Sequence, residues 1–298
     1  MTAIAAEPPR PGRLRRLAAW LHAHRRVQML LLLAAPVLWI GLVYLGSLAI
    51  LLLNAFWDTD AFSGRVVARF TLESFQQLIG SEVYRTIALR TIGMAVAVTL
   101  TDILLAFPIA YYMARVASRR TRTMLLIAVL MPLWASYLVK IYAWRVILQG
   151  NGLLDWLLTP LGIDGPGLTQ VANSWVVLSY LWLPYMILPI YAGLERIPNS
   201  LLEASADLGG RAGATFRRVV LPMVLPAIVA GSIFTFSLTL GDYITPTMVS
   251  STQFIGNVIY QNSSLGSLPL AAAYSFVPIV IMIAYLLVAR RLGAFESL

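Results

Sequence analysis

Long apolar stretches alternate with short polar ones along the chain. Each apolar stretch is at least about 20 residues long, which is the length of helix that crosses a bilayer. Six such stretches cover approximately residues 28–54, 86–114, 123–148, 171–193, 222–245 and 269–289. This pattern predicts an all-α polytopic membrane protein with six transmembrane helices. Prolines inside several stretches are tolerated in such bundles, where they fix kinks.

The first apolar stretch follows a basic segment that ends in HAHRR. It is too long for the core of a signal peptide, which is about 7–15 residues, and no small-residue cleavage motif follows it. We therefore expect residues 1–26 to be a basic cytoplasmic segment. Residues 27–298 are predicted to form a single transmembrane domain.

Composition supports a membrane protein. The 298 residues are 59% hydrophobic and 12% charged, whereas soluble domains carry about 25% charged residues. The net charge of +9 comes from clusters beside apolar runs, which is typical of membrane topology and does not indicate a nucleic-acid partner. The expected surroundings are the lipid bilayer.

The arginines predict the orientation of the helices. Basic residues concentrate in cytoplasmic loops. Six crossings would put most of the basic residues on one side: Arg10, Arg13, Arg15, Arg16, Arg25, Arg26, Arg115, Arg119, Arg120, Arg122, Arg196, Arg211, Arg217, Arg218, Arg290 and Arg291. Both termini are therefore predicted to be cytoplasmic. The other side is predicted to hold a segment near 55–84 with a short amphipathic helix, TLESFQQLIG, a loop with Asp155 and Asp164, and a loop near 247–268.

A polar loop at about residues 195–222 lies on the predicted cytoplasmic side. Its sequence NSLLEASADLGG predicts a short helix, capped by Asn199 or Ser200, with Glu203 in the first turn. Gly209 and Gly210 are expected to end this helix, and a second helix is expected to begin near Thr215. Such a helix can receive a push from a partner protein, or it can be an amphipathic connector in the lipid interface.

The same loop resembles the EAA motif of type I ABC-importer permeases, E-A-A-x3-G-x9-I-x-L-P. The motif positions are occupied by Glu203, Ala204, Ser205, Gly209, Val219, Leu221 and Pro222. The resemblance implies the MetI-like fold and makes the short helix a coupling helix that docks on a cytoplasmic ATPase. Glu203 would then contact the ATPase, Ala204 and Ser205 would allow close approach, and Gly209 would permit the turn; Asp207, Leu221 and Pro222 are further candidates for coupling.

Two other blocks, MPLWASYLVKIYAWRVILQGNGLLDWLL and TFSLTLGDYITPTMVSSTQFIGNVIY, resemble the spermidine/putrescine branch of this family. The branch implies a bacterial inner-membrane protein that imports polyamines, with other small amines or amino-acid-like solutes as alternatives. It also implies three partners: an ABC ATPase dimer carrying ATP and Mg, a second paralogous permease, and a periplasmic substrate-binding protein.

The chain itself carries no expected catalytic, cofactor or metal site. Lys140 is its only lysine and lacks the glycine-rich context of a phosphate-binding loop. There are no cysteines, and both histidines precede the first apolar stretch. ATP hydrolysis is therefore expected in another polypeptide.

Polar and aromatic residues inside the apolar stretches are candidates for the substrate pathway. Ser232, Thr235, Thr239 and Asp242, here called the polar stripe, have the spacing of one helical face. Such a stripe suits a water-filled pathway, or it can pack helices together. Trp134, Tyr137, Ile141 and Trp144 have similar spacing in the third stretch. Aromatic faces bind ammonium groups, although such a stripe is more often packing; Tyr243 is a further candidate.

Asp102 lies in the middle of the second stretch, where a charge is costly. We expect it either to face the pathway or to pair with Lys140 or Arg145. The predicted mechanism is alternating access driven by the ATPase. A secondary transporter is the main alternative, but it would leave the EAA-like loop unexplained.

Overall fold

The computed structural model describes residues 24–60, 65–149, 152–153, 156 and 170–291. The first 23 residues of the basic segment, and Asp155 and Asp164 of the predicted outer loop, lie outside this range, so the expectations for them stay predictions. The chain divides into two compact units, Met1–Leu53 and Asn54–Leu298.

The first unit contains one long apolar helix. It runs through α2 (Arg25–Leu38), a π-helical segment at Trp39–Leu45, and α3 (Gly46–Asn54). The 28 residues from Val27 to Asn54, most of them apolar, rise about 42 Å at 1.5 Å per residue, which exceeds the bilayer core of about 30 Å. The first predicted transmembrane stretch is confirmed as a helix.

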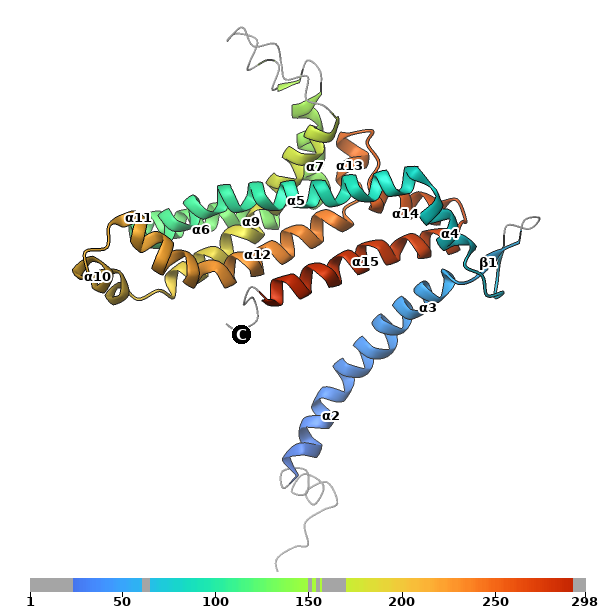
Figure 1. Ribbon diagram of the computed structural model, residues 1–298, viewed down its shortest axis with the longest axis horizontal. Coiled ribbons are helices and arrows are strands. Elements are labelled where there is room, and N and C mark those ends of the chain that lie inside the picture. Colours follow the sequence, from blue (N-terminus) through green and yellow to red (C-terminus); the bar gives the residue numbers. More distant parts are fainter. Residues whose placement is uncertain (1–23, 61–64, 150–151, 154–155, 157–169, 292–298) are drawn as a thin grey trace, which may run out of the picture. The chain divides into compact units, whose positions relative to one another are not determined.

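The second unit is a bundle of long helices. They are α5 (Glu82–Tyr111) with its π-helical end Tyr112–Val116, α9 (Gln170–Glu195), α12 (Leu221–Gly241) and α15 (Leu268–Arg291). α12 is preceded without a break by α11 (Ala212–Thr215) and a π-helical segment at Phe216–Val220. These helices run alongside one another in Figure 1, and all four are long and apolar enough to cross a membrane.

Helices α5, α9 and α12 form the centre of this bundle. Ala106 of α5, Met186 of α9 and Val224 of α12 are fully buried in one apolar cluster. Small residues allow the backbones to approach closely. At Gly193, for example, an added Cβ would lie 2.6 Å from the Cβ of Ala227, so a larger residue would separate α9 from α12.

The third predicted transmembrane stretch is not one straight helix. It consists of α6 (Arg119–Trp134) and α7 (Tyr137–Leu148), which are bent by 95° relative to each other. Ala135 and Ser136 are extended at the break. The two halves pack into different apolar clusters, with Leu125 of α6 in one and Ile141 of α7 in another. The described residues therefore contain five candidate spans, or six if the bent pair is one span.

Short elements connect the long helices. The strands β1 (Asp58–Thr59) and β2 (Val66–Val67) pair antiparallel. The predicted amphipathic helix is confirmed as α4 (Glu73–Gly80). The remaining helices are α10 (Asn199–Asp207), α13 (Ile244–Val249) and α14 (Ile255–Ser264).

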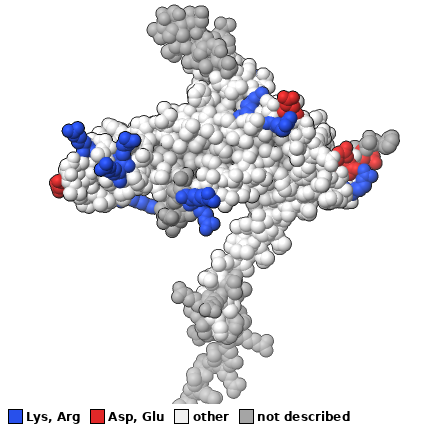
Figure 2. Space-filling view, viewed as in Figure 1, with Lys and Arg blue, Asp and Glu red and all other residues white. Residues whose placement is uncertain are grey.

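Several of the short elements lie at the two ends of the bundle. α10, α11 and the start of α6 lie at one end, here called the arginine end, while β1, α4 and α14 lie at the other (Figure 1). The arginine end contains Arg115, Arg122, Arg211, Arg217 and Arg218. Charged side chains are sparse on the long helices between the two ends in Figure 2. Two of the predicted cytoplasmic loops thus meet at one end of the bundle.

Candidate functional site

Helix α10 carries the EAA-like motif and projects from the arginine end. It has no buried residue. Glu203, Ala204 and Asp207 are exposed, and Ser205 is half-buried. The helix therefore presents most of its surface outward, as a docking element requires.

The start of α10 differs from the sequence prediction. Pro198 precedes the helix in an extended conformation, and no side chain caps it. Asn199 is the first helical residue, and its Oδ1 instead accepts a hydrogen bond of 2.9 Å from Arg115. Glu203 is consequently the fifth residue of the helix and lies outside its first turn. The prediction was wrong on both features. Asn199 is bonded to Arg115, which lies 84 residues away in the π-helical end of α5, and the helix begins one or two residues earlier than either predicted cap allows.

Two glycines end α10, as predicted, but for different physical reasons. Gly209 has φ of +75°, a left-handed conformation that only glycine adopts without strain. Gly210 donates its amide to the carbonyl of Ser205 at 2.8 Å, and a Cβ there would lie 2.6 Å from that oxygen. The chain then enters α11 at Ala212, three residues before the predicted start.

An apolar groove lies beside α10 and faces outward. Its volume is about 350 Å³, and its lining includes Leu201, Ala204, Leu208 and Val219. Leu208 is 90% exposed, which is unusual for a large apolar side chain. Leu221 and Pro222 begin α12, where Leu221 packs against the bundle core. The motif thus joins an exposed helix to a buried one.

Asp242 lies just beyond the C-terminus of α12, between two helices. Its backbone is extended, so it is not on the helical face of Ser232, Thr235 and Thr239 as predicted. Its Oδ2 accepts hydrogen bonds from the hydroxyls of Tyr137 at 2.5 Å and Thr245 at 2.7 Å. Its Oδ1 accepts from the amides of Ile244 and Thr245 at 2.9 and 3.0 Å. The carboxylate therefore starts the turn into α13 and holds α7 against it.

The three α12 members of the polar stripe are all buried. Ser232 accepts a hydrogen bond of 2.8 Å from the hydroxyl of Tyr285 on α15, and Thr235 donates to the carbonyl of Gly231 at 3.2 Å. Thr239 Oγ1 has no hydrogen-bond partner among the described residues. In this conformation the stripe packs between helices, which is the alternative that the spacing left open.

Asp102 is fully buried in α5, with 0% exposure. Neither carboxylate oxygen has a hydrogen-bond partner among the described residues, and Asp102 forms no ion pair with Lys140 or Arg145 there. Three other buried polar atoms lack partners in this part of the chain: Ser179 Oγ and Trp182 Nε1 on α9, and Thr239 Oγ1 on α12. Isolated buried carboxylates are costly and concentrate at functional sites.

The predicted aromatic stripe is divided by the bend of 95°. Trp134 ends α6 and is 91% exposed. On α7, Tyr137 stacks on Trp182 with ring centroids 6.1 Å apart, and Trp144 lies 5.3 Å from Tyr180. Tyr243 stacks on Tyr260 at 4.8 Å. The α7 aromatics therefore pack on α9, and Trp134 is not on their face.

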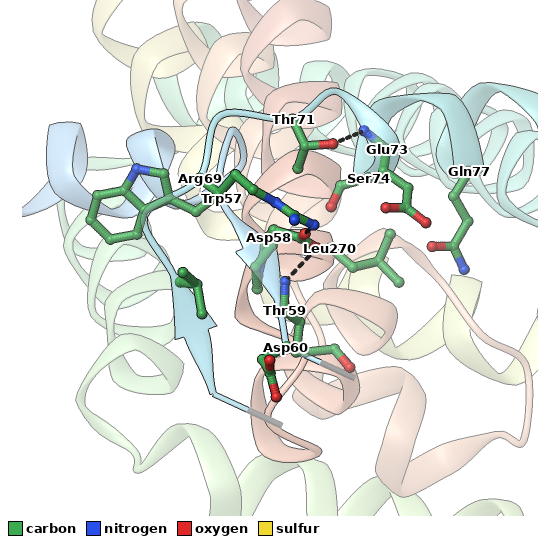
Figure 3. A pocket seen from close by; sticks show the side chains of 13 residues that line it. Trp57, Asp58, Thr59, Asp60, Arg69, Thr71, Glu73, Ser74, Gln77 and Leu270 are labelled. Carbon is green, nitrogen blue, oxygen red and sulfur yellow. Dashed lines mark hydrogen bonds and ion pairs between the residues drawn. The ribbon is translucent and has the colours of Figure 1, made fainter. Parts of the chain in front are cut away.

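A polar cleft of about 630 Å³ opens at the end opposite α10 (Figure 3). It lies among β1, β2, α4 and the start of α15. Three acidic residues line it, Asp58, Asp60 and Glu73, together with Arg69, which forms an ion pair with Asp58. The sequence predicts that the segment near 55–84, which contains these acidic residues, lies on the outer side, but it does not predict that they line one cleft.

Comparison with known proteins identifies the class of this bundle. Residues 15–295 match the family described as binding-protein-dependent transport system inner membrane component. The chain belongs to this family of ABC importer permeases and is an inner-membrane protein.

Two curated relatives from Escherichia coli (strain K12) narrow the relationship. The chain is 45% identical to the inner membrane ABC transporter permease protein YdcU, with 99% of both chains covered. It is 31% identical to the spermidine/putrescine transport system permease protein PotB, covering 84% of this chain and 91% of the relative. These relatives confirm the predicted branch of the family.

A solved structure supports the fold. A bacterial ABC transporter involved in the import of the acidic polysaccharide alginate matches with a TM-score of 0.66 and 19% identity, over 92% of this chain and 99% of that chain. The predicted MetI-like importer fold is therefore confirmed.

Proposed function

We propose that this permease forms half of the translocation pathway for a small cationic amine, with spermidine and putrescine as the leading substrates. Its relationship to PotB supports the polyamine class, and YdcU, whose name states no substrate, leaves room for another small amine or an amino-acid-like solute. The observation that carries the transport mechanism is the exposed α10 with its EAA-like motif. A secondary transporter would have no use for such a helix.

The proposed mechanism is alternating access driven from the arginine end. An ABC ATPase dimer, which binds ATP and Mg, receives α10 in a groove with Glu203, Ala204, Ser205 and Asp207 at the contact. Gly209 gives the turn that follows, and Leu221 and Pro222 pass the movement into α12. A second, paralogous permease supplies the other half of the pathway, and a periplasmic binding protein delivers the amine.

On the substrate side, the candidates are carboxylates, hydroxyls and aromatic rings of the bundle. The carboxylate of Asp102 accepts no hydrogen bond from the residues that the structure describes, whereas the carboxylate of Asp242 accepts four. We propose that an opened bundle exposes Asp102, Thr235 and Thr239 to the amine. Asp242, Tyr243 and the ring faces of Tyr137, Trp144 and Trp134 are the candidates nearer the outer side.

The test of this function uses the complete transporter in proteoliposomes. Uptake of radiolabelled putrescine and spermidine should require ATP and the loaded binding protein. Glu203→Arg should abolish both uptake and copurification of the ATPase, whereas Glu73→Arg, the same charge reversal on α4 at the other end, should leave copurification intact. Uptake driven by an ion gradient without ATP would refute the importer. ATP-dependent transport that excludes both polyamines would refute the substrate class alone.

A further inference from the structure

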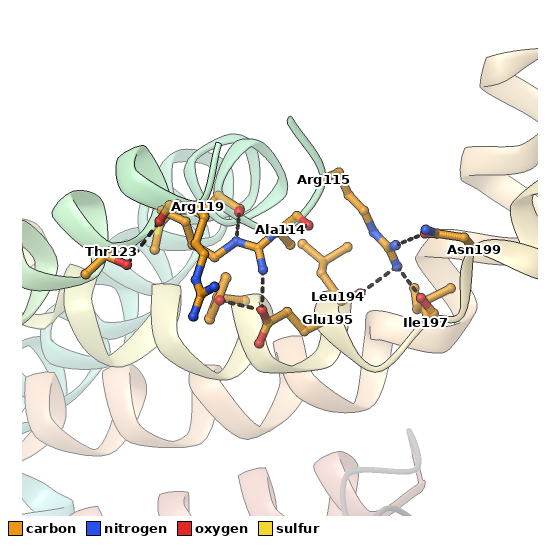
Figure 4. A network of polar contacts seen from close by, with 11 residues as sticks. Ala114, Arg115, Arg119, Thr123, Leu194, Glu195, Ile197 and Asn199 are labelled. Atoms are coloured by element: carbon orange, nitrogen blue, oxygen red, sulfur yellow. Dashed lines mark hydrogen bonds and ion pairs between the residues drawn. The ribbon is translucent and has the colours of Figure 1, made fainter. Parts of the chain in front are cut away.

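Two arginines tie the corner between α5 and α6 to the chain that leads into α10 (Figure 4). Arg115 Nη2 donates to the carbonyls of Leu194 and Ile197 at 2.6 and 2.7 Å, and its Nη1 donates to Asn199 Oδ1 at 2.9 Å. One guanidinium thus joins the last turn of α9, the linker after it and the first residue of α10.

Arg122 of α6 contacts the π-helical end of α5, the segment that contains Arg115. It donates to the carbonyls of Met113 and Ala114 at 3.1 and 3.2 Å, within the π-helical end of α5. It also forms an ion pair of 3.0 Å with Glu195, whose carboxylate accepts a hydrogen bond of 2.6 Å from the hydroxyl of Tyr191. Arg115 and Arg122, with these acceptors, are called the arginine clamp below.

The clamp matters because α10 has few other contacts with the bundle, among them the half-buried Leu202, which packs against the apolar cluster of α5, α9 and α12. None of its residues is buried. Near its other end, the side chain of Ser205 is hydrogen-bonded to Thr215 at 2.8 Å, which connects it toward α12. A push on α10 can therefore reach α12 through Thr215, and it can reach α5 and α6 through Asn199 and Arg115.

The chemistry requires arginine. Its planar guanidinium offers five N–H donors in a fixed geometry, so that it can bridge acceptors on separate segments. The carbonyls at the C-terminus of a helix lack intrahelical partners and favour a nearby cation. Lysine has a compact ammonium group that cannot span the same three acceptors in one geometry.

We propose that Arg115 is a positioning residue for energy coupling, which makes α10 and the α5–α6 corner move as one body. This inference rests on the proposed role of α10 as the coupling helix. It assigns α5 a direct share of the movement, whereas the EAA-like motif by itself connects α10 only to α12.

The chain lacks cysteine, so a pair of spin labels can be attached to the purified permease, before assembly with its partners, without labelling any other position of this chain. Ala206 on α10 and Arg120 on α6 are both exposed, so the variant Ala206→Cys/Arg120→Cys can carry one label on each helix. With Arg115 present, double electron–electron resonance should give a narrow distribution of distances between the labels at positions 206 and 120. The mean distance should not change when the assembled transporter is trapped with ATP and vanadate. Arg115→Gln should broaden the distribution and lower transported putrescine per ATP hydrolysed by roughly tenfold, because the charged hydrogen bonds between α10 and the α5–α6 corner are lost.

Arg119→Gln is the matched control: it removes the same charge from the same corner, where the Arg119 side chain makes no hydrogen bond to another described residue. Equal distance distributions and equal coupling ratios in Arg115→Gln and Arg119→Gln would overturn the proposal. Arg115→Lys keeps the charge and should transport an intermediate amount of putrescine per ATP hydrolysed. It replaces Arg115→Gln if that variant does not fold. A wild-type ratio in Arg115→Lys would also overturn the proposal. If no ATPase binds the unmodified chain, the proposed function fails, while the label distances in the permease alone still test the clamp.

Discussion

The hydroxyl of Tyr137 lies 2.5 Å from Oδ2 of Asp242, and this contact joins the start of α7 to the end of α12. Both helices are interrupted at this point, α7 by the bend from α6 and α12 by the turn into α13. The carboxylate has accepted four donors from Tyr137, Ile244 and Thr245. A residue that the sequence suggests as a substrate ligand therefore also holds two helix ends together.

Asp242→Ala should destabilise the protein more than Tyr137→Phe does. The alanine removes the acceptor of four donors. The hydroxyls of Tyr137 and Thr245, 2.9 Å apart, can still bond each other, but the amides of Ile244 and Thr245 lose their side-chain acceptor, and each unsatisfied buried donor costs about 1–3 kcal/mol. The phenylalanine removes one donor and keeps the acceptor paired with the other three, which predicts a loss of about 1 kcal/mol. Thermal unfolding of the purified protein in detergent measures both. A larger effect of Tyr137→Phe would contradict this account of the contact.

Asp242→Asn separates the structural role of this residue from transport. Asparagine keeps the oxygen that accepts the amides of Ile244 and Thr245, and the two hydroxyls can reorient toward its amide group. Assembly with the ATPase should therefore be intact, while uptake of a cationic amine should fall because the negative charge is lost. Copurification and putrescine uptake are measured side by side, and normal uptake would remove Asp242 from the pathway.

Asp102→Asn should impair transport without harming the fold. The carboxylate of Asp102 is buried and has no hydrogen-bond partner in the described part of the chain, so replacing it with a neutral group of the same shape removes a desolvation cost. The melting temperature should stay constant or rise, while putrescine uptake should fall at least tenfold. Unchanged uptake would exclude a pathway role, and a lower melting temperature would show that the carboxylate has a stabilising partner.

The two glycines after α10 should differ in their sensitivity. Gly209→Ala places a Cβ in the left-handed region, at a cost of about 1–2 kcal/mol. Gly210→Ala must displace the backbone oxygen of Ser205. Both should loosen the turn and speed tryptic cleavage after Arg211 by roughly fivefold or more, because local opening controls proteolysis.

Gly213→Ala is the control for this pair. A Cβ at Gly213 meets nothing within 4 Å, and alanine favours the helical conformation of α11 by about 0.5–1 kcal/mol. Cleavage after Arg211 should be unchanged or slower in this variant. Equal acceleration in all three variants would mean that the turn geometry is not what protects the loop.

Local pattern predicted much of the fold. Among the described residues, one long helix accounts for most of each of five apolar stretches, although the fifth stretch breaks at Asp242 before its predicted end. Long apolar runs form helices because they must satisfy their backbone polar groups internally in a bilayer. α4 and the glycine end of α10 were likewise predictable, since amphipathic spacing and a left-handed glycine are properties of a few adjacent residues. The family, too, followed from residues at fixed spacing in one loop.

Contacts between distant segments decided the rest. The bend after Trp134 depends on which clusters Leu125 and Ile141 enter, and the bonding of Asp242 depends on Tyr137, 105 residues away. Arg115 looks like one more topological charge in the sequence, yet it reaches Asn199 across 84 residues. The sequence by itself determined which segments are helices and which loop carries the motif, because these are set by neighbours along the chain. Only the tertiary structure decided which buried polar groups find partners, because that depends on packing between helices far apart in sequence.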